Sequence, residues 1–93
     1  MIEGKAVVKF GTGDVLITPL VKEDFSSGCV VLQNKGTHVV GEYSQNFEKS
    51  EDDTILSFSS VESLDVFIDR LERLKLMMSG DLKGCLSPIE YDY

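Results

Sequence analysis

Apolar and polar residues alternate in short runs over the first two thirds of the chain, a pattern typical of β-strands. A loop containing Gly11 and Gly13 separates the first two runs, which predicts a hairpin between them. Pro19 has no N–H to donate, which places the second run at a sheet edge. The runs that we interpret as strands are 5–10 (KAVVKF), 15–21 (VLITPLV), 29–33 (CVVLQ), 37–40 (THVV) and 54–59 (TILSFS).

The pattern then changes to a helical period, which predicts one long amphipathic helix over residues 60–79. Ser59 followed by Glu62 fits a capping box at its start, and Gly80 is placed to end it as the C′ residue. The apolar residues that share one face of this helix are Leu64, Phe67, Ile68, Leu71, Leu74 and Met78.

Together these elements predict an α+β fold, with a four- to five-stranded antiparallel sheet and the helix packed on one face. One domain should span residues 1–80, and 81–93 should form a tail that docks on the body or adds a short edge strand. Whether the acidic loop 42–53 is ordered stays open. Besides the helix face, the expected core consists of Val7, Val15, Ile17, Val30, Leu32, Val39, Leu56 and Phe58.

Composition narrows the classes of partner. The chain has 93 residues, with 9 basic and 16 acidic side chains and a net charge of −7. Such an acidic chain is unsuited to direct binding of nucleic acid or an anionic membrane, whereas a basic protein partner is compatible with it. No apolar stretch is long enough to span a bilayer. With only Cys29 and Cys85 and no apolar leader, a reduced cytoplasmic protein is expected.

No motif indicates catalysis, a metal or a cofactor. The Gly-Thr-Gly turn at 11–13 precedes a strand rather than a helix, so it lacks the amides of a phosphate loop. The three acids at 51–53 are adjacent and do not have the ligand spacing of a calcium loop. His38 with Cys29 could be drawn as a dyad, but Cys29 lies in an apolar strand-like run. We therefore expect no cofactor and no enzyme activity.

Two features suggest surfaces for a partner. Val66, Arg70, Arg73 and Met77 form a second stripe on the helix, away from its apolar face, and Arg and Met are common at interfaces. The alternative is that its apolar members are ordinary stray surface residues. In the tail, Tyr91 and Tyr93 alternate with acids and could add to a sheet edge or dock on their own domain.

Residues 36–78 resemble a pattern found in small uncharacterised β-sheet-plus-helix proteins of bacteriophages and prophages. The likeness lies in GTHVVGE, then an acidic loop, then ILSFSSVESLDVFIDRLERLKLMM, in which an E-S-L-D-V helix start leads to a K-x-x-M end. It covers under half of the chain and implies the cytoplasm of a bacterial host, with no catalytic residue.

In that setting the first hypothesis is a non-enzymatic binding protein that antagonises a host or defence protein by occupying its surface, as a homo-oligomer. The second is an oligomeric protein that sequesters a small signalling molecule such as a nucleotide. An anionic nucleotide would need several basic residues brought together, because the overall charge opposes it. The third is a minor structural or assembly component of a virion.

Overall fold

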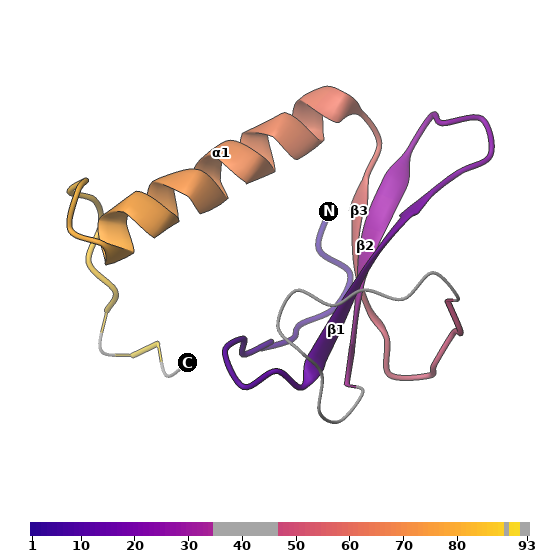
Figure 1. The fold of residues 1–93 in the computed structure, drawn as a ribbon, viewed down its shortest axis with the longest axis horizontal. Helices are drawn as coiled ribbons and strands as arrows, with labels where there is room; N and C mark the ends of the chain where they lie inside the picture. The colour runs from indigo at the N-terminus through magenta and orange to yellow at the C-terminus, as the bar shows by residue number, and fades with distance from the viewer. Residues whose placement is uncertain (35–46, 89, 92–93) are drawn as a thin grey trace. The chain divides into compact units, whose positions relative to one another are not determined.

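Three apolar runs pair into an antiparallel sheet in the computed structural model, which describes residues 1–34, 47–88, 90 and 91. The strands are β1 (Val15–Val21), β2 (Gly28–Asn34) and β3 (Thr54–Phe58), in the spatial order β1-β2-β3. Figure 1 shows them side by side and twisted. Ile17 pairs with Leu32, and Leu32 pairs with Thr54, so β2 is hydrogen-bonded on both sides. The α+β class is confirmed.

The predicted number of strands is wrong for the part of the chain that the structure describes, which has three strands rather than four or five. Residues 5–10 form no strand, and the expected hairpin with 15–21 is absent. The hairpin joins β1 to β2 instead, through the loop 22–27. The predicted strand at 37–40 lies outside the described residues. Pro19 does lie in an outer strand of the described sheet, as expected.

The two faces of the sheet are both partly buried. On one face, which we call face A, the register aligns Leu16 with Gln33 and Thr18 with Val31. These four side chains are buried, Val31 with 2% of its surface exposed. On the opposite face, face B, Leu32 is buried and its neighbour Ile17 is exposed. The hydroxyl of Thr18 is buried with no hydrogen-bond partner in the described residues.

The expected core is therefore only partly correct. Leu32 is buried, and Val15, Val30 and Phe58 are half-buried. Val7, Ile17 and Leu56 are exposed, and Val39 lies outside the described residues. The strands are apolar on both sides, so alternation alone does not reveal which face is better covered.

The helix α1 (Val61–Met78) forms where the apolar periodicity predicts it. Its N-cap is Ser60 rather than the predicted Ser59, because the Ser60 hydroxyl accepts a hydrogen bond from the Ser63 amide at 3.2 Å. The predicted Ser59–Glu62 capping box is thus displaced by one residue. Glu62 instead places a negative charge in the first turn, where it complements the helix dipole.

The end of α1 confirms the role expected of Gly80. Its φ of 84° is left-handed, a conformation that glycine adopts without steric conflict. The Gly80 amide donates to the Met77 carbonyl and the Asp81 amide to the Leu76 carbonyl. This pair of hydrogen bonds is the Schellman motif, which satisfies carbonyls that the helix leaves unpaired.

The chain divides into two compact units, the sheet unit (Met1–Ser59) and the helix unit (Ser60–Tyr93). Each is described by itself. The packing of the helix across the sheet, within a single domain of residues 1–80, stays a prediction. The tail contains no helix or strand in its described residues 81–88, 90 and 91.

The position of the N-cap can be tested by two alanine substitutions. Ser60→Ala should lower the free energy of unfolding by about 1 kcal/mol, because it removes the cap of the first turn. Ser59→Ala, one residue earlier, should change it by less than about 0.5 kcal/mol. Urea unfolding followed by circular dichroism measures both values. A larger effect at Ser59 would restore the predicted capping box.

Candidate functional site

The predicted stripe on α1 is accessible along most of its length. Val66 and Arg73 are exposed, and the Arg70 side chain keeps 68% of its surface exposed. Arg70 forms an ion pair with Asp69, its neighbour in sequence. An exposed pair of this kind contributes little free energy, so a partner carboxylate could replace it.

The last member of the stripe, Met77, is half-buried by the tail. A Cβ atom added at Gly84 would overlap the end of the Met77 side chain, so the backbone at Gly84 lies directly against this side chain. The tail therefore covers Met77 from within the helix unit. Sequence reasoning missed this, since the contact depends on how the chain turns after Gly80.

The tail candidates are only partly described. Tyr91 is exposed, and its amide donates to the Pro88 carbonyl at 3.1 Å, a turn rather than an extended strand. Tyr93 lies outside the described residues. The described tail thus provides one exposed aromatic side chain.

A clamp built on Gln33 fixes the segment that precedes β3. Gln33 is 3% exposed, and its amide nitrogen donates to the Glu48 carbonyl at 2.9 Å and to Asp53 Oδ1 at 2.8 Å. Asp53 Oδ2 accepts from the Ser50 amide. Since a buried polar group requires partners, these hydrogen bonds hold residues 48–53 against the sheet.

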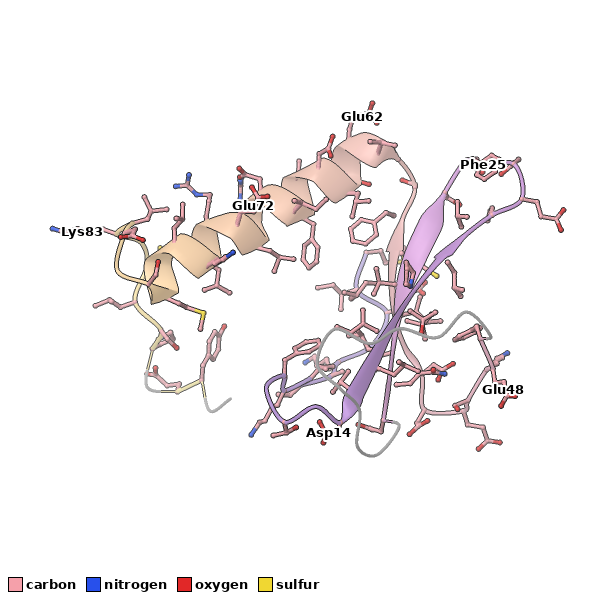
Figure 2. All side chains as sticks on the ribbon, in the orientation of Figure 1. Asp14, Phe25, Glu48, Glu62, Glu72 and Lys83 are labelled. Carbon is pink, nitrogen blue, oxygen red and sulfur yellow. The ribbon has the colours of Figure 1, made fainter. Side chains whose placement is uncertain are left out.

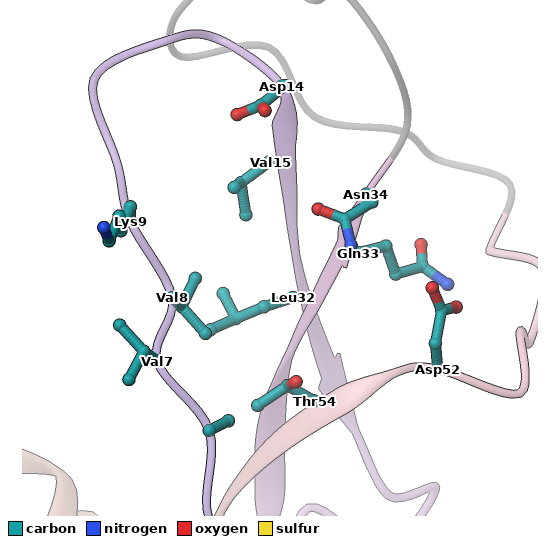
Figure 3. A pocket seen from close by; sticks show the side chains of 11 residues that line it. Val7, Val8, Lys9, Asp14, Val15, Leu32, Gln33, Asn34, Asp52 and Thr54 are labelled. Atoms are coloured by element: carbon teal, nitrogen blue, oxygen red, sulfur yellow. The ribbon is translucent and has the colours of Figure 1, made fainter. Parts of the chain in front are cut away.

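The same segment contributes to a pocket of about 360 Å³ in the sheet unit (Figure 3). Residues 6–9 form one wall, where Val8 points toward Leu32. Val15 and Thr54 also line the pocket, so this N-terminal segment lies over the face of the sheet rather than beside its edge. That placement explains why an apolar, β-branched run forms no strand.

The polar groups of this pocket limit what it could bind. Asp14 and Asp52 supply two carboxylates, and Lys9 is the one basic residue among those that line the pocket. Its volume is near the lower end of small-ligand sites, which range from about 300 to 1,000 Å³. Two carboxylates against one ammonium favour a ligand that donates hydrogen bonds or carries positive charge, and they oppose a phosphate group.

The β1–β2 hairpin ends in a feature that sequence reasoning did not identify. Phe25 lies at its tip, 79% exposed, with a left-handed φ of 60° (Figure 2). Both the Ser26 amide and the Ser26 hydroxyl donate to Asp24 Oδ1, at 3.0 and 2.7 Å. These hydrogen bonds, led by that of the hydroxyl, hold the pKa of the Asp24 carboxyl below its ordinary value.

Among the described residues, no group of three His, Cys, Asp or Glu side chains could hold a metal ion. His38 lies outside those residues, so the Cys29–His38 dyad is not described. No helix in the described part of the chain has the length and hydropathy needed to span a membrane.

Comparison with known proteins gives no relative. No family model, curated protein or solved structure matches the chain.

The clamp predicts a measurable loss of stability. Gln33→Leu fills similar space but leaves the Glu48 carbonyl and the Asp53 carboxylate without a shared donor, which should cost about 1–3 kcal/mol of unfolding free energy. Asn34→Leu, at the next and exposed position, provides the control. Equal urea midpoints for the two variants would contradict the clamp.

The turn at Asp24 predicts a pH effect. NMR titration of the Asp24 carboxyl should give a pKa below 3.8, and Ser26→Ala should return it toward that value because the largest cause is removed. The pKa of Asp24 is lower in the folded chain than in the unfolded chain, so ionised Asp24 stabilises the turn at any pH above the unfolded pKa. This stabilisation is lost as the pH falls through the folded pKa. An unchanged titration in Ser26→Ala would exclude the proposed cause.

Proposed function

We propose that this chain is a non-enzymatic, phage-type binding protein that antagonises a host or defence protein by occupying its surface. The observation that carries the proposal is the exposed stripe of Val66, Arg70 and Arg73 on α1. Both arginines of the chain lie on it, and Arg70 is paired only with its sequence neighbour among the ion pairs of the described residues. Arginine is well suited to such a surface, because its planar donors can bind a carboxylate in two places.

The apolar face of the same helix either packs on the sheet, as the sequence predicts, or adds to this surface. No residue of α1 is buried, and the exposed members of this face include Ile68, Leu71 and Leu74. An amphipathic helix of this kind can bind a groove through residues spaced by three and four positions. A target surface that carries carboxylates beside an apolar strip would match both the stripe and this face.

The pocket of the sheet unit favours a second candidate, the sequestering of a small molecule. Its lining has apolar walls at Val8 and Leu32 and carboxylates at Asp14 and Asp52. This chemistry suits a small amine better than the nucleotide first considered, since a phosphate would meet like charge. A thermal-shift panel of cyclic nucleotides and polyamines distinguishes the two ligand classes.

The binding function can be tested with a charge-reversed stripe. The immobilised wild-type chain should capture one host protein from a bacterial lysate. The Arg70→Glu/Arg73→Glu variant should bind that protein at least about 10-fold more weakly, because its new carboxylates would face the carboxylates of the target. Calorimetry with the purified host protein measures the ratio, and circular dichroism checks the helix.

The matched control is Lys5→Glu/Lys49→Glu, which changes the net charge equally at exposed positions of the sheet unit. It should bind as the wild type does. Equal binding by all three chains, or no captured protein, would overturn the proposed use of the stripe.

A further inference from the structure

We propose that two copies of this chain associate through the β1–β2 hairpin, with Phe25 of each copy inserted into an apolar depression beside the turn of the other copy's hairpin. This inference goes beyond the proposed function and uses a different surface. It concerns the sheet unit alone, whereas the host-binding stripe lies on α1.

Two features of Phe25 are energetically unfavourable in the described fold. Its ring is 79% exposed at the hairpin tip (Figure 2). It also has the only left-handed φ of a non-glycine residue in the described chain, a conformation that is uncommon and unfavourable for a bulky residue. An exposed aromatic side chain on a fixed backbone has the character of a binding anchor, since little backbone entropy is lost when it is buried.

The turn fixes the backbone at Phe25. The Phe25 amide donates to the Lys22 carbonyl at 2.9 Å, and the Lys22 amide donates to the Ser27 carbonyl at 3.0 Å. The Asp24 carboxylate adds the two hydrogen bonds from Ser26. The loop is therefore closed by four hydrogen bonds around Phe25.

A receptor for such a ring lies beside the turn of the same hairpin. An open, mainly apolar depression of about 290 Å³ is lined by Leu20, Gly28 and Cys29 of the hairpin and by Ile55 and Ser57 of β3. Phe25 is not among the residues that line it. Ile55 is exposed at its side, so a ring placed there would remove apolar surface of both partners from water.

The turn carries charges of both signs, at Lys22, Glu23 and Asp24, so a twofold contact can pair the lysine of each copy with the acids of the other. Lys22 also lines the depression, and Glu23 and Asp24 precede Phe25 at the tip. Insertion of the tip thus brings two carboxylates toward the partner's lysine, which offsets part of the repulsion between two chains of charge −7.

The hairpin of each copy carries both the ring that inserts and the depression that receives it. A twofold dimer needs both on the same surface. In an isologous interface each contact occurs twice, so both rings and both depressions are used together. The occupant of the depression is accordingly a second copy of this chain.

The two free thiols make this interface measurable. Cys29 is half-buried in the depression, and Cys85 is exposed in the tail. In the wild-type chain, the rate at which Ellman's reagent labels Cys29 should fall by about 10-fold or more as the protein concentration passes the dimer Kd. The labelling rate of Cys85 should stay constant, and sedimentation equilibrium should show the corresponding change in mass.

Phe25→Asn is the informative variant, because asparagine tolerates the left-handed backbone but has no ring. It should raise the dimer Kd by about 30-fold or more, the usual effect of losing an interface anchor. It should also make Cys29 labelling independent of concentration. Phe10→Asn, at another exposed phenylalanine of the sheet unit, should leave both measurements as in the wild type.

The charges supply a second test. Lys22→Glu should weaken association several-fold, and adding Glu23→Lys should recover part of the loss. A monomer at all concentrations would overturn the proposal. A dimer that Phe25→Asn leaves intact would also overturn it. This includes a dimer that dissociates only when the charges of Arg70 and Arg73 are reversed. Neither result bears on capture of a host protein, which is measured separately.

Discussion

The rest of the sheet unit depends on the burial of β2 on both sides. Leu32 and Gln33 are consecutive in this strand, so their side chains point to opposite faces, and both are buried. A central strand of this kind needs other segments of the chain packed on both face A and face B of the sheet. Residues 6–9 provide it on face B, where Val8 meets Leu32, and the segment before β3 provides it on face A through the Gln33 clamp.

This arrangement links the stability of the sheet to the candidate pocket. Asp52 and Asp53 are adjacent, but Asp53 accepts the hydrogen bond from Gln33 and Asp52 lines the pocket. The clamp therefore sets the position of one of the two pocket carboxylates. A change that loosens the clamp would alter the electrostatics of the pocket before it unfolds the sheet, because the carboxylate would no longer have a fixed position.

Local signals in the sequence were sufficient for several elements. The bounds of β1 and the role of Gly80 follow from residue types whose backbone preferences are strong. The N-cap was displaced because Ser59 and Ser60 are adjacent, and each has a possible partner three residues later. The stripe of Val66, Arg70 and Arg73 could be read from the helical period, since that period fixes the direction of each side chain.

Features that depend on distant contacts could not be predicted. Residues 5–10 have the composition of a strand, yet they cover a face, and nothing in their own sequence distinguishes these roles. The half-burial of Met77 depends on the approach of Gly84, seven positions away along an irregular tail. The left-handed backbone of Phe25 is equally hidden, because a phenylalanine in a polar loop gives no signal for it.

Pro19 has a consequence for how the molecule behaves when it is concentrated. It lies in β1, an outer strand of the described sheet, and it cannot donate a backbone hydrogen bond. A foreign strand that joined this edge would find the row of donors interrupted and a rigid ring in its way. Growth into fibrils through β1 is thereby discouraged, which matters for a chain that exposes apolar side chains such as Phe25 and Ile55.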